Sequence, residues 1–198
     1  MNDITLTTCQ GQSIAPYLED LARLRIRVFR DFPYLYDGDF TYEAEYLSRY
    51  AECPQSLFVL AFDGEALVGA ATAMPLSAEM DEFRAPFIES DYPLDSIFYY
   101  GESVLLADYR GMGIGKAFME AREDHALRQG FTTVAFCAVE REANHPLRPA
   151  DYRPLHEFWQ GRGYQRIPSL ATTFAWKDID AAEETHKTLV FWVKELAA

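Results

Sequence analysis

The segment YRGMGIGKAF, Tyr109–Phe118, constrains this chain more than any other part of its sequence. It places three glycines and two cations between an apolar run and a helix-like run. Backbone amides at a helix N-terminus point outward without partners, and the helix dipole adds partial positive charge there. Because glycine lets a phosphate group approach such amides closely, the segment predicts a phosphate-binding loop. A glycine-rich turn that binds no ligand is the alternative.

The familiar nucleotide-binding motifs do not fit this segment. A Walker loop needs a glycine where this chain has Arg110, and it needs Ser or Thr after its lysine, where this chain has Ala117. A dinucleotide fingerprint spaces its glycines unevenly, whereas Gly111, Gly113 and Gly115 are separated by single residues. A phosphate ligand at this loop would therefore be held by a different motif.

Length and charge limit the class of protein. The chain has 198 residues, 31 of them acidic and 18 Lys or Arg, for a net charge of −13. This length suffices for one well-buried domain over 1–198, and the charge argues against nonspecific binding to nucleic acid or an anionic membrane. No apolar run approaches the ~18 residues that span a bilayer, and the first residues lack a signal-peptide pattern. We expect a cytoplasmic protein with no nucleic-acid or membrane partner.

The cysteines do not suggest a covalent or metal framework. Cys9, Cys53 and Cys137 are widely separated and have no close histidine partners in the sequence. We therefore expect neither disulfides nor a zinc site, and no other metal.

Apolar periodicity predicts alternating strands and helices. Strands are expected over 4–8, 56–62, 66–74, 97–106, 131–139, 172–176 and 187–193. Helices are expected over 16–32, 115–129 and 155–164, with a shorter one over 41–50, and Gly130 is the predicted C-cap of the 115–129 helix. Residues 75–96 are acidic, contain three prolines and predict an ordered insertion of undefined form. The mixed order indicates one α/β (α+β) domain with a partly antiparallel sheet.

At the glycine-rich segment the sequence resembles the GCN5-related N-acetyltransferase (GNAT) family. The pattern Arg-x-x-Gly-x-Gly is carried by Arg110, Gly113 and Gly115, and the similarity extends over 103–131 and the later segment LHEFWQGRGY. The resemblance implies a GNAT fold from about residue 4 to 194. Its central sheet would be mixed and mostly antiparallel, with the strands at 97–106 and 131–139 splayed apart.

The same resemblance implies acetyl-CoA as co-substrate. In the family this loop binds the pyrophosphate, and the pantetheine lies in the splay, where its amides would pair with the backbone of Val104, Leu105 and Leu106. The implied cofactor-binding residues are Val104, Leu105, Leu106, Arg110, Gly111, Met112, Gly113, Ile114, Gly115, Lys116 and, in the loop after 131–139, Asn144.

Acetyl transfer to an amine requires a group that takes the amine's proton. Glu102 is the first candidate, because a carboxylate in a mostly apolar strand is unusual and partial burial tunes its acidity. Strand parity favours Tyr99 instead, since family bases often lie an even number of residues before the position of Leu105. A bulge between Tyr99 and Leu105 would reverse this parity.

The late helix departs from the family pattern. The tyrosine that commonly acts as general acid maps onto Trp159, whose indole cannot serve that role. Tyr152 or Tyr164 could substitute, as could water, or the thiolate could leave unassisted. His145 and His156 are candidate bases or else surface and capping residues.

The acceptor pocket is expected from FRDFPYLYDGDF, residues 29–40, together with the 75–96 insertion. Tyr34, Tyr36, Asp37 and Asp39 could surround a cationic amine, with Glu102 also in contact, or they could be packing aromatics beside solvated aspartates.

Two functions remain open at this point. The first is direct transfer of an acetyl group from acetyl-CoA to a primary amine of a small molecule or peptide. The second is a module of the same fold that holds acyl-CoA without catalysis. A homodimer is compatible with either one.

Overall fold

The computed structural model describes residues 4–197. Within them, one eight-stranded sheet has the order β1-β2-β3-β4-β6-β8-β7, and β5 pairs with β3. The strands are β1 Ile4–Cys9, β2 Leu57–Asp63, β3 Ala66–Pro75, β4 Ile97–Tyr99, β5 Ser103–Leu105, β6 Thr133–Val139, β7 Gln165–Lys177 and β8 Glu184–Glu195. Only the β4–β6 pair is parallel among these strands. The predicted mixed, mostly antiparallel α/β fold is confirmed.

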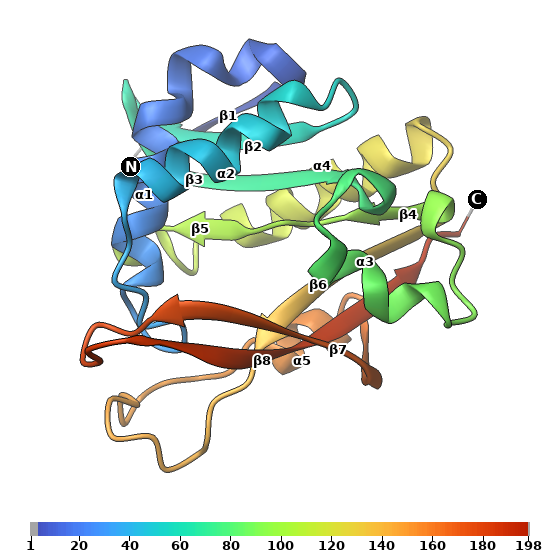
Figure 1. Ribbon diagram of the computed structural model, residues 1–198. Coiled ribbons are helices and arrows are strands. Elements are labelled where there is room, and N and C mark those ends of the chain that lie inside the picture. Colours follow the sequence, from blue (N-terminus) through green and yellow to red (C-terminus); the bar gives the residue numbers. More distant parts are fainter. Residues whose placement is uncertain (1–3, 198) are drawn as a thin grey trace.

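Helices cover both faces of this sheet (Figure 1). They are α1 Leu18–Phe29, α2 Phe40–Glu52, α3 Asp81–Ile88, α4 Ile114–Arg128 and α5 His156–Gln160. In Figure 1, α1 and α2 lie in front of the sheet and α4 lies behind it. The second helix is one residue longer than the first, not shorter as predicted. The reason is its N-cap, because the Asp39 carboxylate accepts the Tyr42 N–H at 2.9 Å and starts the helix early.

Glycines with positive φ delimit α4. Gly113 (φ 84°) is the N-cap, and Gly130 (φ 85°) follows the helix as the predicted C-terminal glycine. The buried face of α4 carries Phe118 and Met119, which pack with Phe98 and other residues of the sheet. This packing fixes the glycine-rich segment at the end of β5.

The insertion at 75–96 is ordered, as predicted, and its form is now defined. It contains a 3₁₀ turn at Leu76–Ala78, the helix α3 and a second 3₁₀ turn at Leu94–Ser96. Phe87 of α3 packs edge-on against Phe191 of β8, with ring centroids 4.8 Å apart. The insertion therefore covers the same sheet face as α1 and α2.

The strand predicted over 97–106 is interrupted by a β-bulge. The Gly101 N–H donates to the Thr72 carbonyl at 3.2 Å, and the Thr72 N–H donates to the Glu102 carbonyl at 3.0 Å. Gly101 and Glu102 therefore both lie opposite Thr72, which gives this strand one extra residue. Buried Arg122 of α4 supports the bulge by donating to the Thr72 and Glu102 carbonyls at 3.2 and 3.1 Å.

The predicted splay begins at this bulge. The Tyr100 N–H donates to the Ala135 carbonyl at 2.8 Å, and after this bond β5 pairs only with β3 among the described strands. Meanwhile β6 continues along β8 as far as the pair Val139 and Leu189. In Figure 1, β5 and β6 accordingly diverge toward the left of the view.

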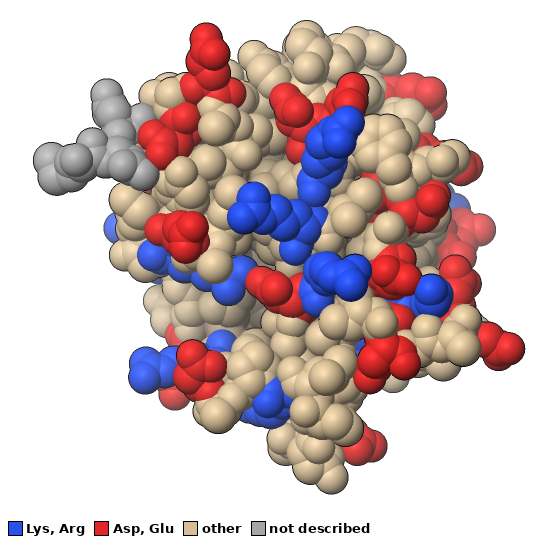
Figure 2. Space-filling view, turned by 90° about the vertical axis from the view of Figure 1, so that its left-hand side faces the viewer, with Lys and Arg blue, Asp and Glu red and all other residues tan. Residues whose placement is uncertain are grey.

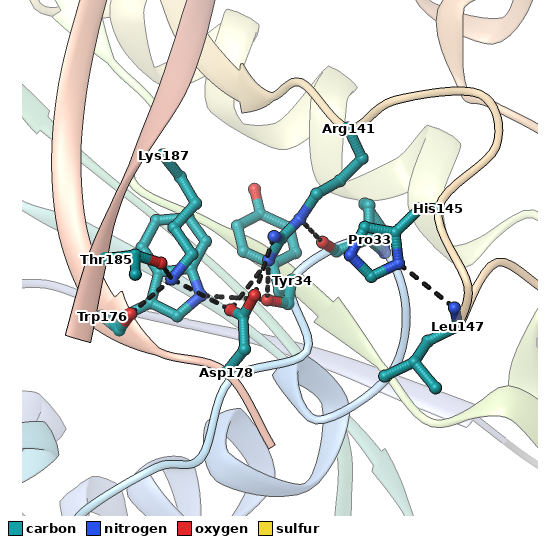
Figure 3. A network of polar contacts seen from close by, with 9 residues as sticks. All are labelled: Pro33, Tyr34, Arg141, His145, Leu147, Trp176, Asp178, Thr185 and Lys187. Atoms are coloured by element: carbon teal, nitrogen blue, oxygen red, sulfur yellow. Dashed lines mark hydrogen bonds and ion pairs between the residues drawn. The ribbon is translucent and has the colours of Figure 1, made fainter. Parts of the chain in front are cut away.

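Asp178, in the turn after β7, is a buried anion with two cationic partners (Figure 3). Arg141 binds both carboxylate oxygens, at 2.8 and 2.9 Å, and the Lys187 Nζ lies 3.1 Å from Oδ1. Partial burial raises the pKa of Asp178, but the hydrogen bonds from Arg141 and Lys187 outweigh it and lower the pKa below its ordinary value.

The ion-pair group of Arg141, Asp178 and Lys187 also holds the backbone of the segment between α1 and α2 in place. Arg141 also donates to the carbonyls of Pro33 and Tyr34, each at 2.8 Å, and the Trp176 indole N–H donates to the Tyr34 carbonyl at 2.9 Å. Figure 3 shows these donors converging on the 33–34 backbone from separate parts of the chain. The contacts hold Tyr34 and Trp176 beside each other, with ring centroids 5.9 Å apart.

Residues 4–197 contain neither a membrane-spanning helix nor a metal-binding cluster. No helix there is long and apolar enough to cross a membrane. No cluster of three or more His, Cys, Asp or Glu side chains there has the arrangement of a metal site.

We expect Gly101→Ala to lower the free energy of unfolding by about 1–3 kcal/mol, because a Cβ overpacks this site. The added atom would lie 2.2 Å from the Tyr50 hydroxyl and 2.8 Å from the Thr72 Oγ1. Urea denaturation measures the effect. Gly115→Ala is the control, because its Cβ would meet only Phe158, at 3.9 Å, and should cost nothing. Equal stability of the two variants would contradict the packing at the bulge.

We expect Asp178→Asn to destabilise the fold by about 2–4 kcal/mol at neutral pH, since it leaves Arg141 and Lys187 without their shared anion. The folded-state pKa of Asp178 is depressed, so its contribution is complete above the unfolded pKa of about 3.9 and is lost as pH falls through the folded value. The stability difference from wild type should therefore shrink below about pH 4. A difference that is independent of pH would refute the assigned ion pairs.

Candidate functional site

The glycine-rich segment forms an open loop before α4. Gly111 (φ 77°) and Gly113 (φ 84°) adopt backbone conformations that favour glycine, and a Cβ added to either residue would meet no atom within 4 Å. The first N–H groups of α4 have no partner within the helix. Arg110 and Lys116, the cations of the loop, have side chains 53% and 56% exposed. The loop therefore offers amides, positive charge and space to an anion.

The surface around the loop differs from the acidic character of the whole chain. Figure 2 shows the side of the molecule on which β5 ends, with several Lys and Arg side chains grouped near its centre among scattered carboxylates. Arg110 lies 3.6 Å from Asp31, in an exposed pair that contributes little to stability. An entering phosphate could therefore replace Asp31 as the partner of Arg110 at small cost.

Alternate residues of β5 direct their backbone N–H and C=O groups into the splay. The Leu106 N–H already donates to the Val68 carbonyl at 3.0 Å, and Val104 is registered with Ala70. Backbone groups alternate along an antiparallel pair, so Val104 and Leu106 direct theirs toward β3, and Ser103 and Leu105 direct theirs into the splay. Leu105 and Ser103 therefore direct their backbone groups toward the splay, whereas β3 already uses those of Val104 and Leu106. The pairing of this backbone with pantetheine stays a prediction.

A cavity of about 340 Å³ opens on the face covered by α1, α2 and α3. The loop between α1 and α2 contributes Tyr34, Tyr36, Asp37 and Asp39 of the predicted acceptor set, whereas Glu102 of that set is absent from the lining. Phe83 of α3 lines it as well, so the 75–96 insertion contributes to its wall. The two segments that were expected to form an acceptor pocket therefore meet in one cavity.

Nine of the 19 residues that line the cavity are aromatic. Phe83 stacks on Phe174 with centroids 5.7 Å apart and lies 5.4 Å from the Tyr99 ring. Trp176 and Tyr34 form a second aromatic group within the same lining. The cavity thus suits a flat or apolar body.

The carboxylates of the cavity differ in their surroundings. Hydrogen bonding to Lys177, more than any other effect, lowers the pKa of Asp37, and Arg30 acts in the same direction. Asp39 and Glu184 are exposed on the lining. Negative charge at the exposed rim attracts an ammonium group.

The bulge determines which face of the sheet the side chains of Tyr99 and Glu102 occupy. Because it adds one residue, the side chains of Tyr99 and Glu102 lie on the same sheet face. Tyr99 lines the cavity and its hydroxyl lies 3.2 Å from the Cys137 Sγ. Burial raises the pKa of Tyr99, so its hydroxyl stays protonated.

Glu102 lies beneath the cavity rather than in its lining. Its side chain is 2% exposed, and Oε2 lies 2.6 Å from a guanidinium nitrogen of Arg25. Arg25 also pairs with the fully buried Glu43, and the Tyr46 hydroxyl donates to Glu102 at 3.4 Å. Glu102 is therefore part of a buried ion-pair cluster, and its direct contact with an acceptor stays a prediction.

The other candidate acids and bases lie outside the described cavity lining. Tyr164 is buried and donates to Glu123 at 2.8 Å, and Trp159 packs against Phe136 and Trp192. Tyr152 packs edge-on against Phe32, and the His145 Nδ1 accepts the Leu147 N–H. Asn144 is exposed in the loop after β6, and His156 is exposed on α5 beside Trp192. None of these side chains belongs to the cavity lining within residues 4–197.

Sequence reasoning missed several residues of the site. Arg25, Tyr46 and Trp176 lie in segments predicted only as helices or a strand, and none was a candidate site residue. Cys137, expected neither in a disulfide nor in a metal site, also lines the cavity. A basic residue on the apolar face of α1 was the one available signal, because a buried arginine requires an anionic partner.

Comparison with known proteins agrees with this geometry. A family model described as "Acetyltransferase (GNAT) family" matches residues 19–150. No curated protein sequence matches the chain significantly.

Solved structures share the fold at low sequence identity. An N-acetyltransferase from Staphylococcus aureus Mu50 is 10% identical with a TM-score of 0.63, over 98% of this chain and 99% of that one. A ribosomal-protein-alanine N-acetyltransferase from Brucella melitensis is 11% identical with a TM-score of 0.62, over 97% and 99%. A GCN5-related N-acetyltransferase from Kribbella flavida is 19% identical with a TM-score of 0.56, over 96% and 98%.

The family match covers more than half of the chain, and the structural likeness extends over nearly all of it. The glycine loop, the splay and the cavity beside it are thus features of one fold, and the chain belongs to the GNAT acetyltransferase family.

Proposed function

We propose that this protein transfers an acetyl group from acetyl-CoA directly to a primary amine of a small molecule or peptide. The observation that carries the proposal is the position of Gly101. This residue belongs to the bulge where the splay opens, and it also lines the aromatic cavity. A thioester in the splay and an amine in the cavity would meet there.

The residues around the splay fit the shape and charge of CoA. The loop amides at the start of α4, together with Arg110 and Lys116, would hold the pyrophosphate. The free backbone groups of Ser103 and Leu105 would pair with the pantetheine amides. When bound, acetyl-CoA supplies an activated acyl group, so no covalent enzyme intermediate is needed.

The cavity indicates the kind of acceptor. Its aromatic walls favour an apolar or aromatic body, and the carboxylates of Asp39 and Glu184 favour a cationic amine at its entrance. A volume of about 340 Å³ suits a small amine or the end of a peptide. Of the two predicted catalytic residues, Glu102 follows Gly101 in the bulge and Tyr99 lines the cavity.

One observation favours a binding module as a second candidate. Trp159 occupies the position of the family's general-acid tyrosine, and its ring packs against Phe136 and Trp192. Release of CoA thiol in the presence of an amine panel distinguishes the two functions, because a binding module would hold acetyl-CoA and release none.

We expect Gly113→Asp to weaken acetyl-CoA binding by tenfold or more, about 1.4 kcal/mol, because it places a side chain and a negative charge against the pyrophosphate. Isothermal titration calorimetry measures the affinity. Gly130→Asp is the matched control, since it has the same positive φ and the same open surroundings at the far end of α4. Equal affinities in both variants would show that the loop does not bind CoA.

We expect Phe83→Ala to raise the KM for an aromatic amine about three- to tenfold, because it removes the ring that stacks on Phe174 in the cavity wall. Affinity for acetyl-CoA should not change. Phe87→Leu serves as the control, because Phe87 lies on the same helix but packs against Phe191 outside the cavity. An unchanged KM in a folded Phe83→Ala protein would place the acceptor elsewhere.

A further inference from the structure

Two tyrosine hydroxyls, from half-buried Tyr46 and buried Tyr50, connect the cavity to a carboxylate of the insertion. Tyr46 of α2 lines the cavity, and its hydroxyl donates to the Tyr50 hydroxyl at 3.3 Å, one helical turn further along. The Tyr50 hydroxyl in turn donates to Oε1 of Glu79, in the segment between β3 and α3. In this series of hydrogen bonds each hydroxyl donates toward Glu79 and away from the cavity. Glu102 is a second acceptor for the Tyr46 hydroxyl, at 3.4 Å.

The middle hydroxyl lies at the proposed transfer point. The Tyr50 oxygen is 2.2 Å from the position that a Cβ would take on Gly101, the residue where the cavity and the bulge coincide. Only a glycine at this position lets the tyrosine hydroxyl reach the strand. The hydroxyl chain therefore passes beside the opening of the splay.

The two carboxylates at this chain have different surroundings. Glu102 has a cationic partner, because its Oε2 lies 2.6 Å from a guanidinium nitrogen of Arg25. Glu79 is 4% exposed, and among residues 4–197 it has no ion-pair partner. It is held instead by hydrogen bonds from the Tyr50 hydroxyl and the Met80 N–H, the latter at 2.7 Å. A buried carboxylate without a cation gains most from taking up a proton.

We infer that Tyr46, Tyr50 and Glu79 form a proton relay that deprotonates the acceptor amine, with Tyr46 at the cavity and Glu79 as the final proton acceptor. The inference rests on the proposed function. It also gives the 75–96 insertion a chemical role, since Glu79 belongs to it.

The proton and electron balance of the relay is complete. A bound ammonium gives one proton to the Tyr46 oxygen, Tyr46 passes its own proton to Tyr50, and Tyr50 passes its own to Glu79. The freed nitrogen lone pair forms the new C–N bond to the thioester carbonyl carbon. The C–S bond breaks with its electron pair going to sulfur, and the second nitrogen proton ends on the thiolate. Glu79 returns its proton to solvent after the product leaves.

The electrostatic surroundings of Glu79 set its acidity. The titratable groups around it are Tyr46, Arg49 and Tyr50 of α2, Tyr99 of β4, Glu102 of the bulge and Cys137 of β6. Burial is the largest effect and raises the pKa of Glu79, while the bonds from Tyr50 and Met80 and the charge of Arg49 oppose it. A raised pKa brings a proton acceptor closer to the operating pH.

The first experiment measures rates. Wild type, Tyr46→Phe, Tyr50→Phe, Glu79→Gln and Glu102→Gln are assayed for CoA release with acetyl-CoA and 2-phenylethylamine, hexylamine or an alanyl dipeptide across a pH range. We expect the Tyr46, Tyr50 and Glu79 variants to lose roughly 10²-fold in kcat, with the acidic limb of the pH–rate profile removed. Affinity for acetyl-CoA should not change. Tyr100→Phe is the matched control, because Tyr100 is equally buried but packs beside Tyr164 and Arg122, apart from Tyr46, Tyr50 and Glu79.

The second experiment needs no ligand. Carboxyl ¹³C NMR of glutamate-labelled protein should show Glu79 titrating above the ordinary value of about 4.3. Tyr50→Phe should raise this pKa further, because it removes a hydrogen bond that favours the carboxylate. This readout remains informative if Glu79→Gln fails to fold.

Three results would overturn the relay. A folded Tyr50→Phe protein with wild-type kcat and acidic limb refutes it while the proposed function stands. Loss of the acidic limb in Glu102→Gln alone shows that the proton ends on Glu102. Wild-type protein that binds acetyl-CoA but acetylates none of the three amines at any pH refutes both the relay and the proposed function.

Discussion

The structure depends most on the backbone bulge at Gly101 and Glu102, opposite Thr72. One extra residue ends the pairing of this strand with β6 and opens the splay. The same residue turns Glu102 to the face that carries Tyr99, and the missing side chain of Gly101 admits the Tyr50 hydroxyl. The splay, the aromatic cavity and the buried ion-pair cluster around Glu102 therefore all depend on this one bulge. Arg122, reaching from α4 to the bulge carbonyls, couples the glycine loop's helix to the same point.

Buried charge is distributed unevenly around this point. Asp178 and its two cations lie next to Trp176 of the cavity wall, where Arg141 holds the Pro33–Tyr34 backbone in place. Such a group is costly to desolvate but specifies one arrangement, because removal of any partner leaves a charge unpaired. Near the bulge, by contrast, Glu79 is buried with hydroxyl and amide donors only, as far as residues 4–197 show. The charge of Asp178 is balanced by two cations, which suits a structural role. The charge of Glu79 is balanced only by hydrogen bonds, which suits proton transfer.

Local sequence predicted much of the fold and part of the site. The alternation and helical spacing of apolar residues placed the main strands and helices, and the glycines before α4 marked an open loop at the N-terminus of that helix. Tyr34, Tyr36 and Phe83 of the insertion line one cavity, and its use by an acceptor stays a prediction. The pairing of Leu106 with Val68 could not be predicted, because the direction of a backbone N–H depends on register with another strand. The roles of Arg25 and Cys137 were missed for a similar reason, since burial and polar partners come from distant segments.

The sequence by itself determined the element order, the positive-φ glycines and the resemblance to a family, because each is encoded in local spacing and backbone preference. Only the tertiary structure decided that Tyr99 and Glu102 lie on one face, that Glu102 pairs with Arg25, and that Tyr46, Tyr50 and Glu79 form a connected chain. The physical reason is that a single bulged residue reverses side-chain parity, and hydrogen bonds between remote side chains exist only after packing brings them together.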